Sequence, residues 1–492
     1  MDVSEPQPQP HVVILPFPAQ GHIKPMLMLA QLFCNNANFY VTFVNTHHTH
    51  NLIHKLINKT NFKRLFPTLR FEAIPDGLPP QHPRSGPQVL DIFFTMGFES
   101  KAKFKDVLTG LHQQEEWSPP TCIIADGIMS FAIDVAEDLH IPVITFRTYN
   151  ASCTWLYFHI QNLIQQGEIP FQGDDDMDRP IACIPGFESL LRRRDLPSIC
   201  RLEDAQNPIL QFYITQTSAM TRASALILNT FDELESPIIS KLGSLFPKIY
   251  TIGPLHALFK SRTTHYTESD SSNGSLREQD MTCLTWLDSQ PSKSVIYVSF
   301  GSVATLTRDQ LLEFWYGLVN SEKPFLWVIR EGLLLGDDTV VETPAELEVG
   351  TTESGCIVRW APQEEVLTHR AVGGFLTHSG WNSTLESILA GIPMICWPQL
   401  ADQQVNSRCV SELWKVGLDM KDFCDRSTVE KMVRNLMEGK REEIMKSIAG
   451  NSKMACDSVK EGGSSYCNLE KLIEDIRSMR STTKNIAHVG NE

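Results

Sequence analysis

The feature that most constrains the fold is a series of short, uninterrupted apolar runs separated by helical stretches. Four such runs occur in the first half, at Val12–Phe17, Phe39–Asn45, Cys122–Asp126 and Pro142–Phe146. They lack the apolar–polar alternation of a strand with one solvated face, so both faces of each strand are expected to be buried. A helical stretch from about Pro25 to Phe33 follows the first run. This order predicts a parallel sheet with crossover helices.

The pattern is interrupted once and then begins again. Residues 261–279 are polar and contain almost no apolar anchors, which predicts a linker or loop. Beyond them, an apolar run at 294–302, a helical stretch at 309–319 and another apolar run at 325–330 repeat the earlier order. The chain of 492 residues also exceeds the size of a single core. The sequence therefore predicts two doubly wound α/β domains.

One segment of the second half, residues 360–403, joins a buried strand to a polar helix start. GGFL at 373–376 is apolar, and HSGWNS at 378–383 opens the helical run TLESILA, which Gly391 ends. The first N–H groups of a helix have no partner inside the helix and lie at the positive end of its dipole, so they bind anions. This arrangement is typical of a pyrophosphate site.

The same segment resembles the 44-residue signature of the plant family-1 glycosyltransferases, which glycosylate small molecules with UDP-sugars. It begins with WAPQ at Trp360, carries HSGWNS in its middle and closes with DQ at Gln403. PFPAQGHIKPML, NTFDELE and IGPL extend the resemblance to nearly the whole chain. The resemblance implies the GT-B fold, in which two Rossmann-like doubly wound parallel-sheet domains of the α/β class face a cleft.

The expected domain boundaries follow from the pattern and the resemblance together. We expect an N-terminal acceptor-binding domain over residues 1–255, a linker or flexible loop over 256–284 and a C-terminal UDP-sugar-binding domain over 285–460. Residues 461–480 are expected to form a helix that crosses back to the N-terminal domain, as it does in relatives, and 481–492 a disordered tail.

Composition excludes several kinds of partner and setting. Asp plus Glu outnumber Lys plus Arg by 58 to 43, a net charge of −15, which argues against nucleic acid or an anionic membrane as the main partner. The 12 cysteines are scattered without a CxxC pair, as in proteins of a reducing compartment. The N-terminus is unlike a signal peptide, and no run reaches the ~20 apolar residues of a membrane span. We expect a cytoplasmic monomer with no membrane span.

Transfer of a sugar to a hydroxyl needs a base, and a histidine titrates in the suitable range. His22 directly follows the first predicted strand, where open α/β sheets bind ligands. An isolated histidine there is most simply a surface or capping residue, but in relatives the catalytic base occupies this position. Asp126 closes the run CIIAD and matches the family's aspartate partner, which would fix the imidazole; a helix N-cap is its alternative role. The resemblance thus implies His22 and Asp126 as the catalytic pair.

The resemblance also implies which residues hold the UDP-sugar. The expected contacts are Trp360, Ala361 and Gln363 for uracil, Glu386 for ribose, Ser302, His378, Gly380, Asn382 and Ser383 for the diphosphate, and Trp381, Asp402 and Gln403 for the sugar. Apart from the family, Trp360 reads as a core residue and Glu386 as an exposed helix carboxylate. Gln403 favours UDP-glucose, because relatives with histidine there often use galactose. A helix dipole holds the diphosphate without metal, so we expect no metal and no cofactor, only UDP-glucose as co-substrate.

The acceptor end is less sharply marked. Its candidate wall residues are Phe17, Met96, Phe98, Phe146, Thr148, Asn150 and Phe187, each of which core packing explains equally well. FRTYNAS and LLRRRDLPSICR resemble the branch of the family that glucosylates terpenoids and iridoids. We expect inverting transfer of glucose to a hydroxyl, or a carboxyl, of a small hydrophobic plant metabolite. An iridoid or other terpenoid is the preferred acceptor, and phenolics or flavonoids are the alternative.

Three charged or histidine-rich clusters are interpreted without a catalytic role. Asp174 to Asp176 look like the metal-binding DxD of another glycosyltransferase fold, but no strand precedes them, which favours a solvated loop. His47 to His50 lack zinc-ligand spacing to a cysteine or carboxylate and are interpreted as a polar loop bordering the acceptor. Arg192 to Arg194 are interpreted as a solvated basic turn, with attraction of an acceptor carboxylate as the alternative.

Two other protein classes fit parts of the pattern. A sugar-nucleotide-binding protein without transfer activity would keep the donor residues but would not need both His22 and Asp126. A nicotinamide-dependent oxidoreductase shares the Rossmann-like architecture, but PFPAQGHIKP lacks GxGxxG and the second strand ends in Asn45 rather than in an acidic residue. Both fit the sequence less well than a transferase.

Overall fold

The computed structural model describes residues 9–57, 62–84, 86–171, 176–263, 277–335 and 355–489, and contains two parallel sheets. The strands of the N-terminal sheet are, in spatial order, β3 (Leu69–Ile74), β2 (Tyr40–Thr46), β1 (His11–Leu15), β4 (Cys122–Asp126), β5 (Val143–Arg147), β6 (Ala225–Leu228) and β7 (Ile249–Thr251). Those of the C-terminal sheet are β10 (Gly355–Val358), β9 (Phe325–Val328), β8 (Val295–Ser299), β11 (Val372–Thr377), β12 (Met394–Cys396) and β13 (Gly417–Asp419). The predicted fold class, two doubly wound α/β units, is confirmed.

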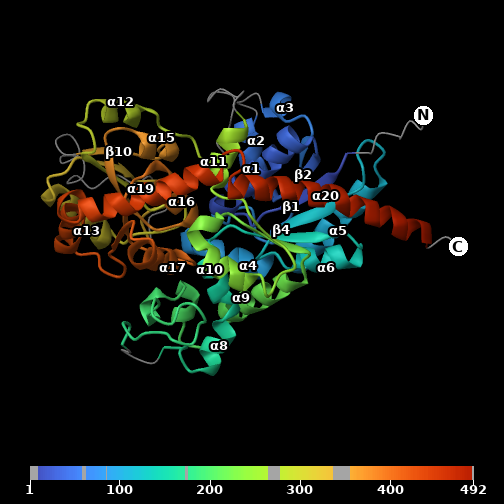
Figure 1. Ribbon diagram of the computed structural model, residues 1–492, viewed down its shortest axis with the longest axis horizontal. Helices are drawn as coiled ribbons and strands as arrows, with labels where there is room; N and C mark the ends of the chain where they lie inside the picture. The colour runs from blue at the N-terminus through green and yellow to red at the C-terminus, as the bar shows by residue number, and fades with distance from the viewer. Residues whose placement is uncertain are drawn as a thin grey trace.

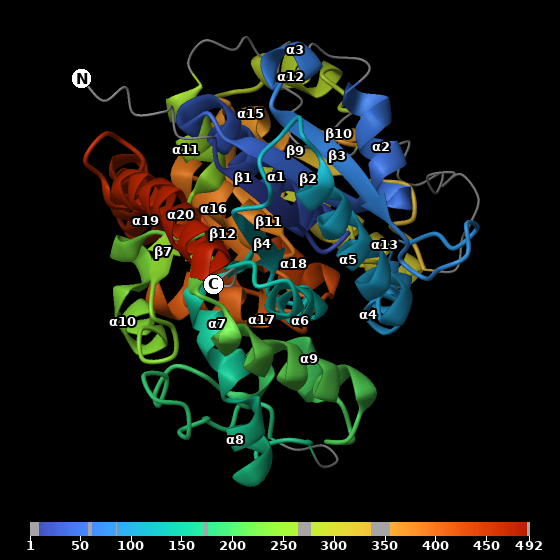
Figure 2. The same cartoon turned by 90° about the vertical axis from the view of Figure 1, so that its right-hand side faces the viewer.

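Helices connect the strands and cover the sheets (Figures 1 and 2). The helices up to the end of the N-terminal sheet are α1 (Gln20–Leu32), α2 (His47–Ile57), α3 (Phe62–Leu65), α4 (Asp91–Thr95), α5 (Phe98–Gln113), α6 (Phe131–Asp138), α7 (Ala151–Phe158), α8 (Ile160–Gln165), α9 (Pro208–Ala219) and α10 (Asp232–Leu242). Those that follow are α11 (Leu255–Arg262), α12 (Thr282–Asp288), α13 (Arg308–Asn320), α15 (Gln363–Thr368), α16 (Trp381–Ala390), α17 (Gln403–Arg408), α18 (Arg426–Arg434), α19 (Arg441–Ser458) and α20 (Ser464–Val489).

The strands are buried on both faces, which explains their unbroken apolar sequences. In β1, Val13 and Leu15 pack into the core on one face of the sheet, whereas Val12 and Ile14 pack into the core on the other. The first of these cores continues into the C-terminal half, where it includes Val295 of β8. The two halves therefore share apolar packing beneath the point at which they meet.

The segment expected to be a linker is partly helical. Residues 255–259 at the start of α11 are all buried, and this helix packs against α1 of the N-terminal half. Helix α12 begins at Thr282, and residues 264–276 between these helices lie outside the described part of the chain. Helix α11 thus occupies the first part of the expected linker, and α12 begins before its end; consecutive burial in α11 leaves no helical periodicity in its sequence.

The last helix, α20, runs from the C-terminal half across to the N-terminal half (Figure 1). Its Leu469 and Leu472 are fully buried in the core that also contains Ile14 of β1. The Tyr250 hydroxyl of β7 donates a hydrogen bond to Asp475 of the same helix. The helix continues to Val489, through most of the segment in which the sequence predicts a disordered tail, and residues 490–492 lie outside the described part.

An ion cluster joins the segment before α9 to the C-terminal half. Asp195 is fully buried and pairs with Lys421 and with Arg192, whose Nε lies 2.9 Å from Asp195 Oδ2. Arg194 donates to Asp422 at 3.1 Å. The basic run at 192–194 is thus not a solvated turn, because neighbouring carboxylates from both halves pair with it. We call Asp195, Lys421, Arg192, Arg194 and Asp422 the interdomain ion cluster.

The sequence also predicts loops at the histidine-rich cluster 47–50 and the acidic cluster 174–176. His47 to His50 form the first turn of α2 rather than a loop, and no group of three metal-ligating side chains occurs among the described residues. Asp174 and Asp175 lie outside the described part. Across the described ranges, no helix combines the length and apolar character that a membrane crossing needs.

Candidate active site

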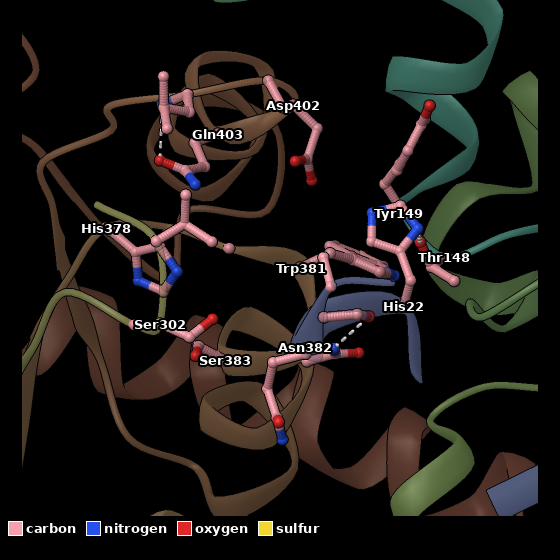
Figure 3. A pocket seen from close by; sticks show the side chains of 18 of the residues that line it. His22, Thr148, Tyr149, Ser302, His378, Trp381, Asn382, Ser383, Asp402 and Gln403 are labelled. Carbon is pink, nitrogen blue, oxygen red and sulfur yellow. Dashed lines mark hydrogen bonds between the residues drawn. The ribbon is translucent and has the colours of Figure 1, made fainter. Parts of the chain in front are cut away.

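A cavity of about 460 Å³ lies where the carboxyl ends of the two sheets face each other. Residues that follow β1 and β5 form one wall, and residues that follow β8 and β11 form the other. In Figure 3, His22, Thr148 and Tyr149 lie on one side, and His378 and Gln403 on the other. The edge at which strands end is where open α/β sheets bind ligands.

His22 and Asp126 meet because their strands are neighbours. β1 and β4 run parallel with Leu15 beside Ala125, so the residues that follow emerge at one edge of the sheet. His22 lies in the first turn of α1, and its Nδ1 is 2.7 Å from Asp126 Oδ2. The Asp126 side chain has no solvent exposure, whereas 19% of the His22 side chain is exposed and lines the cavity. Donation of Nδ1–H to the carboxylate leaves Nε2 as the basic nitrogen.

The surroundings of this pair fix both side chains. Thr148 Oγ1 lies 3.0 Å from His22 Nδ1, and the backbone N–H of Ile128 donates to Asp126 Oδ1 at 3.2 Å. The aspartate thus caps its own turn rather than helix α6, which has Ser130 at its N-cap. The carboxylate is therefore oriented before any ligand binds.

The start of α16 supplies free amide groups on the opposite wall. The N–H of Thr384 donates to the carbonyl of Gly380, the first such bond of the helix, so the amides of residues 381–383 have no partner within it. Every residue of HSGWNS except Ser379 lines the cavity. Backbone amides at the positive end of a ten-residue helix suit a diphosphate.

His378 is packed tightly beside these amides and is neutral. A Cβ atom at Gly380 would lie 2.5 Å from its Nε2, so only glycine fits there without displacing the ring. Burial, together with the nearby Arg330 charge, lowers the pKa of His378 to about 4. The imidazole can therefore donate one hydrogen bond to a phosphate oxygen without carrying charge. Ser302, in the turn that follows β8, lines the same part of the cavity.

Glu386 of α16 is held on both carboxylate oxygens. Gln363 Nε2 donates to Oε2 at 2.6 Å and to the Ser383 hydroxyl at 2.9 Å. Lys24 Nζ, from α1 of the other half, lies 2.7 Å from Oε1. A carboxylate has about four lone-pair sites, so each oxygen keeps capacity for a ligand hydroxyl. Trp360 and Ala361 line the cavity as well.

At the cavity, Asp402 can accept a hydrogen bond from a ligand and Gln403 can donate one. Gln403 Oε1 accepts the backbone N–H groups of Gln399 and Leu400 at 2.8 and 2.9 Å, so its Nε2 stays available to donate. Burial raises the pKa of Asp402 to about 6, although a hydrogen bond from Asn406 opposes the shift. The charge of this acceptor thus changes in the range near neutral pH.

Two side chains of α16 also bind backbone of the other half. Trp381 Nε1 donates to the carbonyl of Asn229 at 2.6 Å, so its indole N–H is already engaged. Asn382 Nδ2 donates to the carbonyl of Gly21 at 2.9 Å, next to His22. The helix that begins at the donor wall is therefore tied directly to the turn that carries the histidine.

The remaining wall is mainly apolar and aromatic. Two residues predicted for the acceptor end, Phe17 and Thr148, line it. Its other apolar and aromatic members are Val89, Leu90, Phe93, Ile128, Tyr149, Ile199, Leu202, Ile209 and Tyr213. This part of the cavity suits a hydrophobic ligand with few polar groups.

Several residues predicted at the acceptor end lie elsewhere. Phe146 points to the opposite face of its sheet, into the core with Ile14, because side chains alternate along β5. Asn150 caps α7 through the N–H of Cys153 and donates to Asn406. The structure also places Met96 and Phe187 in the core rather than at the cavity, and the Phe98 side chain lies outside the described part.

The sequence did not indicate several residues that line the cavity. Lys24 and Glu364 meet there, and Tyr149 and Tyr213 also line the cavity. A charged residue at the fifth position of a mainly apolar helix was the available signal for Lys24. The tyrosines carried none, because they come from separate segments, the turn after β5 and helix α9, that only the tertiary fold brings to one cavity. All twelve residues predicted for the UDP-sugar line the cavity.

The family model that matches this chain and two similar relatives are all described as sugar transferases. Residues 111–450 match the family model described as "UDP-glucoronosyl and UDP-glucosyl transferase". The chain is 50% identical over 473 residues to the 7-deoxyloganetic acid glucosyltransferase of Catharanthus roseus, covering 96% of this chain and 98% of the relative. It is 43% identical to a myricetin 3-O-rhamnoside 1,2-glucosyltransferase of Crocosmia x crocosmiiflora, covering 97% and 98%.

A solved structure shows the same architecture. The fold is similar to that of Os79 from O. sativa in complex with UDP, with a TM-score of 0.79, 26% identity and coverage of 94% of this chain and 100% of the other. This chain thus shares its overall fold with a protein that was solved in complex with UDP.

Proposed function

Because the chain belongs to the UDP-glucoronosyl and UDP-glucosyl transferase family, we propose that it transfers glucose from UDP-glucose to a small hydrophobic plant metabolite. One observation carries the proposal. His22, hydrogen-bonded to the buried Asp126, lines the same cavity as the helix start HSGWNS. A base and an anion site thus adjoin one space.

In the proposed reaction, His22 Nε2 takes the proton of the acceptor hydroxyl as its oxygen attacks the anomeric carbon. The bond from that carbon to the diphosphate oxygen breaks in the same step, so the configuration inverts and UDP leaves. The Asp126 carboxylate stabilises the imidazolium that forms. The amides at the start of α16, with His378 and Ser302, stabilise the charge on the departing diphosphate.

The donor parts are assigned by the chemistry of the groups around them. Trp360, Ala361 and Gln363 are proposed for uracil and Glu386 for ribose. Asp402, through its carboxylate, and Gln403, through its free Nε2, are proposed for the glucose hydroxyls. Trp381 would contact the sugar through its ring alone, since its N–H is bound to Asn229.

The two halves take different roles in this proposal. Residues 1–255 bind the acceptor, residues 285–460 bind the UDP-sugar, and the final helix joins the second part to the first. The apolar wall built from the N-terminal half supports this division, as does the position of α16 in the C-terminal half.

The proposed acceptor is an iridoid or related terpenoid. The relative from Catharanthus roseus is named for 7-deoxyloganetic acid, and half of its residues are shared with this chain. Aromatic and aliphatic side chains at the acceptor wall, with Thr148 beside His22, suit a compact apolar skeleton that carries a hydroxyl group. A phenolic acceptor is the alternative, since another relative is named for a myricetin rhamnoside.

The test combines an acceptor screen with one substitution. Hydroxylated iridoids, terpenoids and phenolics are incubated with UDP-glucose, and glucosides are detected by their gain in mass. With the best acceptor, His22→Ala is expected to lower kcat at least about 10²-fold, while the Kd of UDP-glucose changes less than about twofold. Near-normal turnover by His22→Ala would refute the role of the base. Binding of UDP-glucose with no release of UDP when any acceptor is added would indicate a binding protein rather than a transferase.

A further inference from the structure

Lys24 has no part in the proposed reaction, yet it lines the same cavity as His22. It follows His22 by two residues on α1 and reaches the C-terminal half. Its Nζ lies 2.7 Å from Glu386 Oε1 and 2.7 Å from Glu364 Oε1. All three side chains line the cavity, and only 17%, 3% and 8% of the Lys24, Glu386 and Glu364 side chains are exposed.

The charges of this cluster balance. Two carboxylates that share one partner atom repel each other in a partly dry site unless a cation lies between them. Lys24 is that cation, and Lys260 pairs with the second oxygen of Glu364 at 2.9 Å from the solvent side. Burial opposes the charge of Lys24, but Glu364 and Glu386 outweigh it and raise its pKa above the ordinary value. Lys24 is therefore a permanent positive charge at neutral pH.

The contact has a geometric consequence for Glu386. Lys24 holds Oε1 and Gln363 holds Oε2, so the carboxylate cannot rotate without breaking a charged hydrogen bond. Each oxygen keeps a lone pair, which is the arrangement required to accept two adjacent hydroxyl groups at once. The contact between Lys24 and Glu386 also joins the two halves. Lys24 belongs to α1, the helix that carries His22, and Glu386 belongs to α16 of the C-terminal half.

We propose that Lys24 is a positioning residue for the donor, which fixes Glu386 so that its two oxygens accept the 2′- and 3′-hydroxyls of the ribose. The inference rests on the proposed function, in which Glu386 binds the ribose. A simpler role for Lys24, as an ion pair that only stabilises the contact between the halves, makes a different prediction. It would affect every nucleotide equally, whereas positioning of Glu386 affects only nucleotides that carry ribose hydroxyls.

The experiment measures two ligands on the full-length chain by calorimetry, UDP and 2′,3′-dideoxy-UDP. Wild type is expected to bind UDP more tightly, because only UDP supplies hydroxyls to Glu386. Lys24→Met is expected to weaken UDP binding about tenfold and dideoxy-UDP binding less than about twofold. Lys24→Arg, which keeps the charge, is expected to restore UDP affinity to within about threefold of wild type. Equal weakening of both ligands, or no weakening of either, would overturn the inference.

Lys260→Met is the matched control, because it removes a lysine that contacts Glu364 alone and lies outside the cavity. It is expected to leave both affinities unchanged. Thermal unfolding of each variant checks the fold, and Lys24→Gln replaces Lys24→Met if the latter does not fold. If wild type fails to bind UDP, the proposed function fails with the inference. If wild type distinguishes the two ligands and Lys24→Met distinguishes them equally well, only the inference fails.

Discussion

His22 meets two oxygen atoms at the same ring nitrogen, which decides where its proton lies. Asp126 Oδ2 is 2.7 Å from Nδ1, and Thr148 Oγ1 is 3.0 Å from it. The Asp126 carboxylate can only accept, so Nδ1 is the protonated nitrogen and Nε2 carries the lone pair. The carboxylate is fully desolvated, which strengthens its attraction for an imidazolium.

Asp126→Asn is expected to lower kcat about 10³-fold, because an amide NH₂ favours the tautomer with the proton on Nε2. The measurement is steady-state kinetics with the best acceptor and UDP-glucose. Calorimetry of UDP-glucose is expected to show a Kd within about twofold of wild type, since Asp126 lies outside the donor contacts. A kcat within a few-fold of wild type would contradict the role of Asp126.

Asp402 makes donor binding depend on pH. Its carboxylate has a pKa raised to about 6 by burial, so it is charged above that pH and protonated below it. Because the charged form accepts sugar hydroxyls better, the Kd of UDP-glucose is expected to rise as pH falls from 7 to 5. Calorimetry on the His22→Ala variant isolates this effect from the base, and Asp402→Asn should bind weakly with no pH dependence in that range. A pH-independent Kd in His22→Ala would exclude Asp402 as the titrating group.

At the scale of elements, the anion site depends on the close approach of α16 to the end of β8. The His378 ring fills the space beside Gly380, and the turn after β8 brings Gly301, with φ of 71°, against the same ring. A glycine is required at both points, since a Cβ at either would displace the imidazole. The sequence motif is therefore a packing requirement as well as a source of amides.

Gly380→Ala is expected to weaken UDP binding at least about tenfold, because its Cβ would lie 2.5 Å from His378 Nε2 and push the ring out of place. Calorimetry of UDP is the measurement. Gly450→Ala is the control, since nothing lies within 4 Å of a Cβ there. It is expected to bind UDP normally and to gain slightly in Tm, because alanine suits a helix interior better than glycine. Equal UDP affinity of the two variants would contradict the packing argument.

The strands and the donor wall could be predicted from the sequence because their signals are local. The run Cys122–Asp126 is β4 itself, since an apolar stretch bounded by polar residues marks a buried strand. The donor residues of 360–403 follow one another along a single strand–helix unit. The face to which Phe146 points was not predictable, because both faces of β5 are buried and the sequence does not distinguish them.

The remaining contacts were not predictable because they join distant segments. Lys24 meets Glu386 across 362 positions, and Asn150 meets Asn406 across 256. No local pattern encodes such pairs, and they follow only from how the two halves pack. The acceptor wall was not predictable for the same reason, since several separate loops and helices contribute its residues.

At the scale of the whole molecule, the interdomain ion cluster holds the two halves together. Lys421→Met is expected to lower the free energy of unfolding by about 3 kcal/mol, because it leaves the fully buried Asp195 short of a cation. Lys453→Met is the control, as its partner Asp457 and the lysine itself are 41% and 79% exposed. Loss of that exposed pair is expected to change the free energy of unfolding far less than Lys421→Met does, because solvent screens it. Urea denaturation measures both variants, and equal losses would show that burial of the cluster has no special effect.

The return of α20 to the first sheet means that this chain cannot be divided into two parts at one point. A recombinant that takes its donor half from one parent and its acceptor half from another would place Leu469 and Leu472 against an unmatched surface if the crossover were made only once. Exchange of acceptor preference between related enzymes therefore calls for two crossovers, one between α11 and α12 and one before Ser464. With these two crossovers, α20 comes from the same parent as the N-terminal half against which it packs.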